Sequence, residues 1–94
     1  MTKVDEGAEL LEALRHQLRR EILRTMFGRP RISPSEIAEI LRKPLSGIGY
    51  HVRVLANRGV IELVEEVQMR GTMQHFYRLN IDEPWARSLL GLDG

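Results

Sequence analysis

Apolar residues recur along this chain with two different periods, and the change between them divides the chain into elements. In residues 5–27, 34–41 and 45–58 they return every three or four positions, as on one face of an α-helix. Residues 60–79 are richer in β-branched and aromatic side chains, which are typical of strands. A last apolar stretch covers residues 82–91. The pattern predicts a mainly α-helical (α+β) fold with one β-hairpin, in the order α-α-α-α-β-β-α if the first stretch forms two helices rather than one.

The helix expected over residues 34–41 has distinct start and stop signals. Ser33 is a favourable N-cap, Pro34 fits the first helical position, and Glu36 stands three residues after the serine. This combination is a capping box, in which each side chain bonds a backbone N–H of the other residue. Pro44 disfavours a helical conformation of the residue before it, so the helix should end by then.

The helix expected over residues 45–58 has two unlike sides. The stripe expected to face the core contains Leu45, Ile48, Val52, Leu55 and Gly59. The opposite side contains Ser46, Gly49, Tyr50, Arg53 and Asn57. From Arg42 to Arg58 there are four basic residues and no acid, and a cationic face of this kind suits the phosphates of a duplex. Residues 34–58 therefore predict a helix-turn-helix whose second helix enters the major groove of DNA.

Residues in and around this second helix are candidate DNA contacts. Tyr50 can hydrogen-bond a base edge, and Arg53 can bind guanine or a phosphate. The two glycines either let the backbone approach DNA closely or only relax the turn, and the sequence leaves both interpretations open. His51 lies at the edge of the apolar stripe, so we expect a packed, neutral histidine rather than a ligand or a proton switch. The expected DNA-binding residues are Arg42, Lys43, Ser46, Gly47, Gly49, Tyr50, Arg53, Gln68 and Arg70.

The hairpin is expected to follow Gly59, which would end the preceding helix. Its strands are expected at residues 60–67 and 75–79, joined by a loop over residues 68–74. Helices followed by such a hairpin form a winged helix, and Arg70 at the tip would reach the neighbouring minor groove or its phosphates. An arginine in an exposed turn is also common, and that interpretation stays open. The acids of the first strand should face away from DNA, because they would repel phosphate: Glu62, Glu65 and Glu66.

Both ends of the chain contain more apolar residues than one small core needs. The first apolar stripe is a candidate interface at its beginning, although a position in the core explains it equally well. Near the other end, Asp82 as N-cap and the nearby Pro84 predict the start of a helix. A second copy of the chain is the natural cover for these helices, because most soluble oligomers are symmetric dimers. The candidate dimer-interface residues are Leu10, Leu11, Leu14, Trp85 and Leu89.

Length and composition limit the possible classes of protein. A chain of 94 residues corresponds to one domain, residues 1–94, with a core that dimerisation would extend. The net charge is only +1, so basic residues are not in large excess. The charges are instead segregated, with acids near the N-terminus and basic residues through the centre of the chain. The absence of cysteine excludes disulfides, iron–sulfur clusters and thiolate metal sensing. With no signal peptide pattern and no apolar run long enough to cross a bilayer, we expect a cytoplasmic protein without a membrane partner.

The sequence contains no recognisable catalytic or metal-binding arrangement. His16, His51 and His75 are far apart and lack partners at metal-ligand spacing. The serines have no histidine and aspartate arranged as in a nucleophilic site, and the two helix glycines are too short a pattern for a phosphate loop. We therefore expect no enzyme activity and no cofactor.

Several sequence blocks resemble the winged-helix transcriptional regulators of the ArsR type, especially small actinobacterial-like members. The likeness covers about residues 14–79. Its blocks are residues 18–23, 33–38, 50–55, 70–71 and 75–77. The resemblance implies a dimer built from the first and last helices, paired recognition helices in successive major grooves, and repression by occupying an operator. Such a dimer should prefer an inverted repeat with half-site centres about 10 base pairs apart.

Two departures from this family pattern matter. Its metal-sensing members use cysteines, or histidines and acids on the last helix; this chain has neither cysteine nor a histidine there, so metal sensing is not inferred. Gln17 also stands where the family often has a proline after the position of His16. That difference leaves open whether the first two helices run as one.

The leading hypothesis is a homodimeric, sequence-specific repressor that binds double-stranded DNA, with no evident effector site. The alternative is a winged helix that docks an acidic protein partner, since the net charge is low. A third hypothesis places a small-molecule effector, unknown in kind, between the terminal helices near Trp85.

Overall fold

The computed structural model describes residues 6–92 and has the predicted order of elements. The helices are α1 (Glu6–Ala13), α2 (Gln17–Met26), α3 (Pro34–Leu41), α4 (Leu45–Asn57) and α5 (Pro84–Leu89). The strands are β1 (Ile61–Met69) and β2 (Thr72–Leu79), which pair antiparallel. This is a winged-helix fold, as the sequence predicts. No helix within residues 6–92 is both long enough and apolar enough to cross a bilayer.

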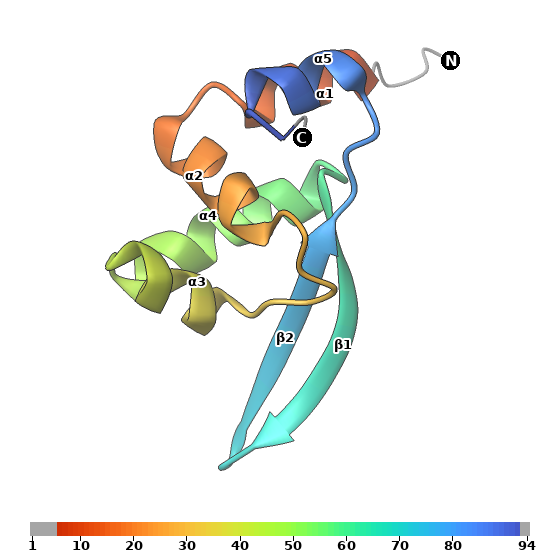
Figure 1. Cartoon of the computed structure of the whole chain (residues 1–94). Helices are drawn as coiled ribbons and strands as arrows, with labels where there is room; N and C mark the ends of the chain where they lie inside the picture. Colours follow the sequence, from red (N-terminus) through yellow and green to blue (C-terminus); the bar gives the residue numbers. More distant parts are fainter. Residues whose placement is uncertain (1–5, 93–94) are drawn as a thin grey trace.

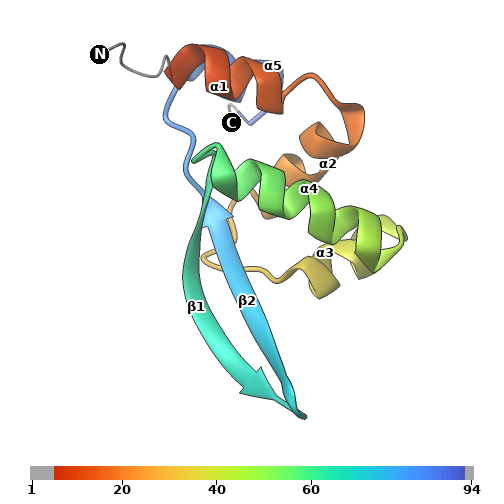
Figure 2. The same cartoon turned by 180° about the vertical axis from the view of Figure 1, so that it is seen from behind.

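The molecule has two distinct ends (Figure 1). Helices α1 and α5 are both at one end, the hairpin projects from the other, and α2, α3 and α4 pack between them. Figure 2 shows from behind how α4 lies beside α3 and above the base of the hairpin. The core contains apolar side chains from every helix and from β1, with Ile22, Leu23 and Met26 of α2 almost completely buried. The chain thus forms one core, from which only the hairpin extends.

Local chemistry positions α3 as predicted. The backbone N–H of Glu36 donates to Oγ of Ser33 at 3.2 Å, and the N–H of Ser33 donates to Oε1 of Glu36 at 2.9 Å. Pro34 occupies the first turn, and the helix ends at Leu41. Arg42 then adopts a left-handed conformation with φ of 55°, which turns the chain sharply toward α4.

Gly59 ends α4 in the predicted way. Its φ of 75° is in the left-handed region, which glycine adopts without steric cost. The N–H of Val60 donates to the carbonyl of Leu55 at 3.1 Å, and both side chains are buried. This hydrogen bond and contact are those of a Schellman motif, which directs the chain into β1.

The hairpin loop is much shorter than predicted. Gln68 pairs with Met73 and Met69 with Thr72, so only Arg70 and Gly71 form the turn. Their φ values of 49° and 83° are both positive, as in a type I′ turn, whose twist matches that of the strands. The loop expected over residues 68–74 was therefore wrong, because the β-hydrogen bonds continue to the tip.

The hairpin also contains a β-bulge and is joined to the segment before α3. Between Leu63 and Glu65 the pairing shifts by one residue, so that Val64 forms a bulge. At the base, Ile32 forms an isolated bridge with Tyr77, with both backbone N–H···O distances at 2.9 Å. This bridge joins the segment before α3 to the hairpin.

The terminal helices differ in detail from the prediction. Residues 5–27 contain two helices, and His16 between them is extended, so they do not run as one. Arginines of α2 donate to the free carbonyls at the end of α1: Arg20 to Leu14 and Arg19 to Glu12. These hydrogen bonds explain why the chain turns here without a proline. Residue 5 of the predicted stretch lies outside the described residues.

Helix α5 (Pro84–Leu89) is shorter than the predicted 82–91 and begins two residues later than that range. Glu83, not Asp82, is its N-cap, and no side chain caps it. Pro84 occupies the first turn as predicted. Because this position suits a proline lacking an N–H, Pro84 fixes the start of the helix.

Candidate nucleic-acid interface

Helix α4 presents a polar face to solvent. Ile48, Val52 and Leu55 are buried, whereas Tyr50 is 53% exposed and Arg53 is exposed as well. Ser46 is also exposed, one turn before Tyr50. Leu45 was expected in the buried stripe but is 51% exposed, because it lies at the first position of α4, beyond the reach of the core. The face that the sequence assigns to DNA is thus open in the single chain.

Gly47 and Gly49 do not serve the packing of the chain itself. A Cβ atom added to either residue would meet no atom within 4 Å. Both residues have helical φ values, so no unusual backbone conformation requires glycine. The structure therefore gives no internal reason for two residues that each cost about 1 kcal/mol of helix stability relative to alanine.

Most arginines in residues 6–92 are engaged within the chain. Three form exposed ion pairs with glutamates: Arg15 with Glu12, Arg31 with Glu65, and Arg78 with Glu62. Others donate to backbone carbonyls, namely Arg19, Arg20, Arg24, Arg29 and Arg87. Arg58 also has interaction partners, including the carboxylate of Glu12 through its charge.

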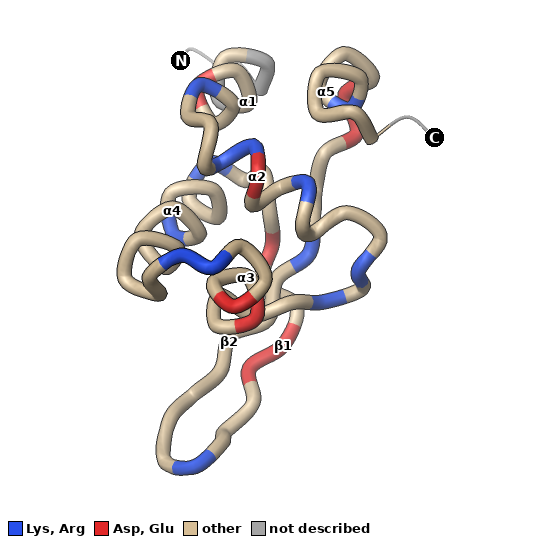
Figure 3. The backbone as a smooth tube through the Cα atoms, turned by 60° about the vertical axis from the view of Figure 1, so that its left-hand side comes forward, with Lys and Arg blue, Asp and Glu red and all other residues tan. Residues whose placement is uncertain are grey.

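Four basic side chains differ from these, and we call them the unpaired cations: Arg42, Lys43, Arg53 and Arg70. All four are exposed, and none makes a side-chain hydrogen bond or ion pair within the part of the chain that the structure describes. They lie on the α3–α4 turn, the outer face of α4 and the tip of the hairpin. Figure 3 shows basic positions at that turn and at the tip, and acidic ones along β1.

Two of the unpaired cations have an unusual backbone. Arg42 and Arg70 are the non-glycine residues with positive φ in residues 6–92. Left-handed conformations cost L-residues about 1–2 kcal/mol. Glycine or asparagine would fit these turns better, so turn chemistry does not explain the choice of arginine.

The acids of β1 have side-chain partners within the chain rather than being left free. Glu62 and Glu65 bind Arg78 and Arg31, and Oε2 of Glu66 lies 3.0 Å from Nε2 of His75. The guanidinium of Arg31 also stacks over the ring of Phe76, 4.4 Å from its centroid. These contacts stiffen the base and middle of the hairpin. Gln68, another predicted contact, is exposed on β1 near the tip.

His51 is half-buried, as the sequence suggests, and it has a partner that the sequence analysis missed. Its Nδ1 accepts a hydrogen bond from Nε of Arg19 at 3.2 Å. The pKa of His51 is lowered, first by burial and then by the positive charges of Arg19 and His16. Arg19 shares the buried face of α2 with Ile22, Leu23 and Met26. The signal that could have identified Arg19 as a buried residue is its place in the helical spacing of the apolar residues of α2.

The predicted dimer-interface residues separate into two groups. Leu10 and Leu14 are buried in the core of the single chain, which agrees with the second explanation given for the first apolar stripe, a position in the core. Leu11, Trp85 and Leu89 are exposed, between 43% and 56%. They belong to α1 and α5, which share the end of the molecule opposite the hairpin tip.

A cavity of about 420 Å³ lies elsewhere, between the end of α2, the base of the hairpin and the start of α5. Phe27, Arg78 and Arg87 help to line it. Trp85 is not among the lining residues, so this cavity is not the effector site expected between the terminal helices. Among the side chains that the structure describes, no group of three or more histidine and acidic residues could hold a metal ion.

Solved structures with the same fold come from several bacteria. The transcriptional repressor BigR of Xylella fastidiosa is 25% identical, with 93% of this chain and 81% of that chain covered and a TM-score of 0.70. The repressor PagR of Bacillus anthracis is 21% identical over 93% and 91% of the two chains, with a TM-score of 0.66. A search of the curated proteins finds no match.

A third structure has the same fold. It is the homodimeric winged helix-turn-helix DNA-binding domain of Mb0332 from Mycobacterium bovis, described as a possible ArsR-family regulator. It is 20% identical, with 95% of this chain and 75% of that chain covered and a TM-score of 0.68. Residues 15–62 of this chain match the family model of winged helix-turn-helix DNA-binding domains, and the chain belongs to this family.

Proposed function

We propose that this protein is a homodimeric transcriptional regulator that binds a specific sequence in double-stranded DNA. The observation that supports this most directly is the position of the unpaired cations. Guanidinium and ammonium groups elsewhere in residues 6–92 are engaged within the chain, whereas these four are exposed around α4 and the hairpin tip. Binding phosphates releases condensed counterions, so such groups contribute affinity without first breaking internal ion pairs.

The residues have different roles in this proposal. Tyr50 and Arg53 project from the middle of α4 and would meet base edges in the major groove. Ser46, Gly47 and Gly49 occupy its first turns, where a bare backbone would allow close approach to DNA. Phosphate contacts would position the protein without reading sequence, and they would come from Arg42, Lys43, Gln68 and Arg70.

The dimer would form through α1 and α5. Their exposed apolar residues Leu11, Trp85 and Leu89 lie at the end away from the hairpin tip. The similar domain of Mb0332 is described as homodimeric, and BigR and PagR are described as repressors. A two-fold dimer would place two copies of α4 in successive major grooves. It would then select an inverted repeat with half-site centres about 10 base pairs apart and act by occupying that site.

Selection of bound duplexes from random DNA with the purified protein tests the proposal. We expect an enriched inverted repeat, a dimer-to-duplex stoichiometry of two chains per site, and an affinity that falls steeply with salt. The tightest duplex recovered is called the selected duplex below. No binding to any duplex at low salt, with retention on an acidic protein surface instead, would contradict DNA binding and favour the protein-docking alternative.

A further inference from the structure

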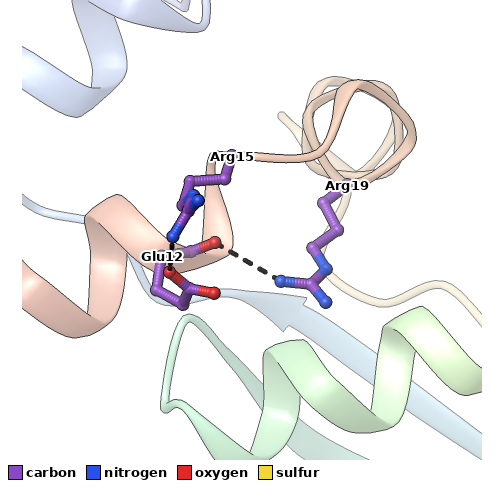
Figure 4. A network of polar contacts seen from close by, with 3 residues as sticks. All are labelled: Glu12, Arg15 and Arg19. Carbon is purple, nitrogen blue, oxygen red and sulfur yellow. Dashed lines mark hydrogen bonds and ion pairs between the residues drawn. The ribbon is translucent and has the colours of Figure 1, made fainter.

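Arg19 of α2 connects two helices that have different proposed tasks. Its Nε donates to Nδ1 of His51 on α4 at 3.2 Å, and its Nη1 donates to the carbonyl of Glu12 at 3.3 Å. Figure 4 shows the second of these contacts, with the side chain reaching from α2 to the end of α1. Glu12 is the penultimate residue of α1, a helix of the proposed dimer interface. One side chain thus links α1 to the helix that would enter DNA.

Packing alone does not explain an arginine at this position. Arg19 is only 6% exposed, and a guanidinium keeps its charge at any ordinary pH. Within residues 6–92 it forms no ion pair, because the nearby carboxylate of Glu12 binds Arg15 instead, at 3.0 Å. An apolar side chain of similar size would usually fill such a site at lower cost in desolvation. What the arginine adds is two directed hydrogen bonds to two different helices.

The acceptor on α4 is held in the form that this contact needs. Nδ1 can accept only while unprotonated, and burial with the charges of Arg19 and His16 lowers the pKa of His51. His51 is next to Tyr50, whose ring packs edge-on against the imidazole with centroids 5.2 Å apart. A shift of His51 would therefore move the side chain proposed to meet base edges.

We propose that Arg19 is a positioning residue, which fixes the orientation of α4 relative to α1 and thereby supports discrimination between DNA sequences. This inference rests on the proposed function. Two α4 helices fit successive grooves only when each is held at a defined angle to the dimer helices. Arg19 makes that connection directly, through two directed hydrogen bonds.

The test uses variants of the full chain that remove one group each. Arg19→Met removes the guanidinium and keeps the apolar stem, while His51→Leu removes the acceptor. His51→Gln keeps an acceptor oxygen and is the conservative variant. Arg15→Met is the matched control, because Arg15 neighbours the same end of α1 but forms only an exposed ion pair. Binding is measured with the selected duplex and with a scrambled duplex of the same composition.

Arg19→Met and His51→Leu should each weaken binding to the selected duplex by about tenfold, and to the scrambled duplex by less than about threefold. Because they break the same hydrogen bond, the double variant should bind no more than about twofold more weakly than the worse single variant. His51→Gln and the Arg15 control should stay within about twofold of the wild type. Additive losses, or equal losses on both duplexes, would overturn the positioning role.

Two further readouts keep the inference separate from the proposed function and from folding. In the free protein, the backbone amide resonances of Tyr50 and Arg53 should shift in Arg19→Met and not in Arg15→Met. Unshifted amides would overturn the inference even if the wild type selects a duplex. Shifted amides in a protein that selects no duplex would support the positioning of α4 by Arg19 and contradict its role in discriminating between DNA sequences. If Arg19→Met does not fold, the pair of His51 variants decides, and equal affinity of the two would overturn the inference.

Discussion

The arginines at the base of the hairpin differ from those on α4 and at the hairpin tip in what they bind, although both groups are exposed. Arg31 and Arg78 lie against glutamates of β1, whereas Arg53 and Arg70 have no hydrogen-bonding or ion-pairing side chain in residues 6–92. An exposed ion pair contributes about 0–1 kcal/mol of stability, so the first group mainly neutralises acids that would repel DNA. The second group is left for an external anion. Pairing status, more than the number of basic residues, therefore distinguishes the candidate interface in a chain with a net charge of +1.

The largest expected difference in DNA affinity is between two single variants, one from each group of arginines. Arg53→Ala should weaken binding to the selected duplex by about 1–3 kcal/mol, because the guanidinium contacts a base or phosphate. Arg78→Ala should change it by less than about 0.5 kcal/mol. Fluorescence anisotropy titrations measure both affinities, with chemical denaturation as the check that each variant folds. Equal losses for the two variants would remove the distinction between the groups.

Gly49→Ala is expected to have a smaller effect, in which the stability of the protein rises and its DNA affinity falls. The added methyl meets no atom of the chain within 4 Å, so the free energy of unfolding should rise by up to about 1 kcal/mol. DNA affinity should fall, because the methyl would separate α4 from the groove. Thr25→Ala on α2 is the control, because the Thr25 hydroxyl donates to the carbonyl of Glu21 within the same helix and has no proposed DNA contact; this variant should leave DNA affinity unchanged. Unchanged affinity for Gly49→Ala would support the interpretation in which this glycine only relaxes the turn.

The smallest expected effect concerns the hairpin tip. Arg70→Asn places a residue suited to positive φ in the type I′ turn, so stability should rise by a few tenths of a kcal/mol. The slope of log affinity against log salt should decrease by about one, since one phosphate contact is lost. Arg70→Lys keeps the charge and should keep the slope. A slope that stays the same in Arg70→Asn would place the hairpin tip away from the DNA backbone.

Sequence reasoning succeeded where the determinants are local. The capping box of Ser33 and Glu36 and the glycine at position 59 depend on residues close in sequence, and both were confirmed. It overestimated the hairpin loop because an arginine at positive φ is an unfavourable choice, which propensity alone does not anticipate. It misplaced Leu45 because helical periodicity does not show where a neighbouring element ends.

Long-range polar contacts were the main omission. Arg19 and His51 are 32 positions apart, and a charged residue within an apolar stripe gives no indication of its partner. The unpaired state of Arg42, Lys43, Arg53 and Arg70 was likewise not visible in the sequence, because it depends on which other arginines find glutamates in the fold. The operator, the dimer contacts and the role of each DNA-binding residue remain predictions.

The bulge at Val64 has a consequence for the whole outer half of the wing. Successive strand residues point to opposite sides, so one extra residue in β1 exchanges the two sides for every β1 residue beyond it. Leu63 pairs with Tyr77 but Glu65 pairs with Phe76, and this change of parity brings Glu65 to the side on which Arg31 stacks. A regular ladder running through Val64 would instead pair Glu65 with His75 and place it on the side of Leu63, away from Arg31. The single unpaired residue near the core therefore decides which side of the wing carries each of the β1 acids beyond it.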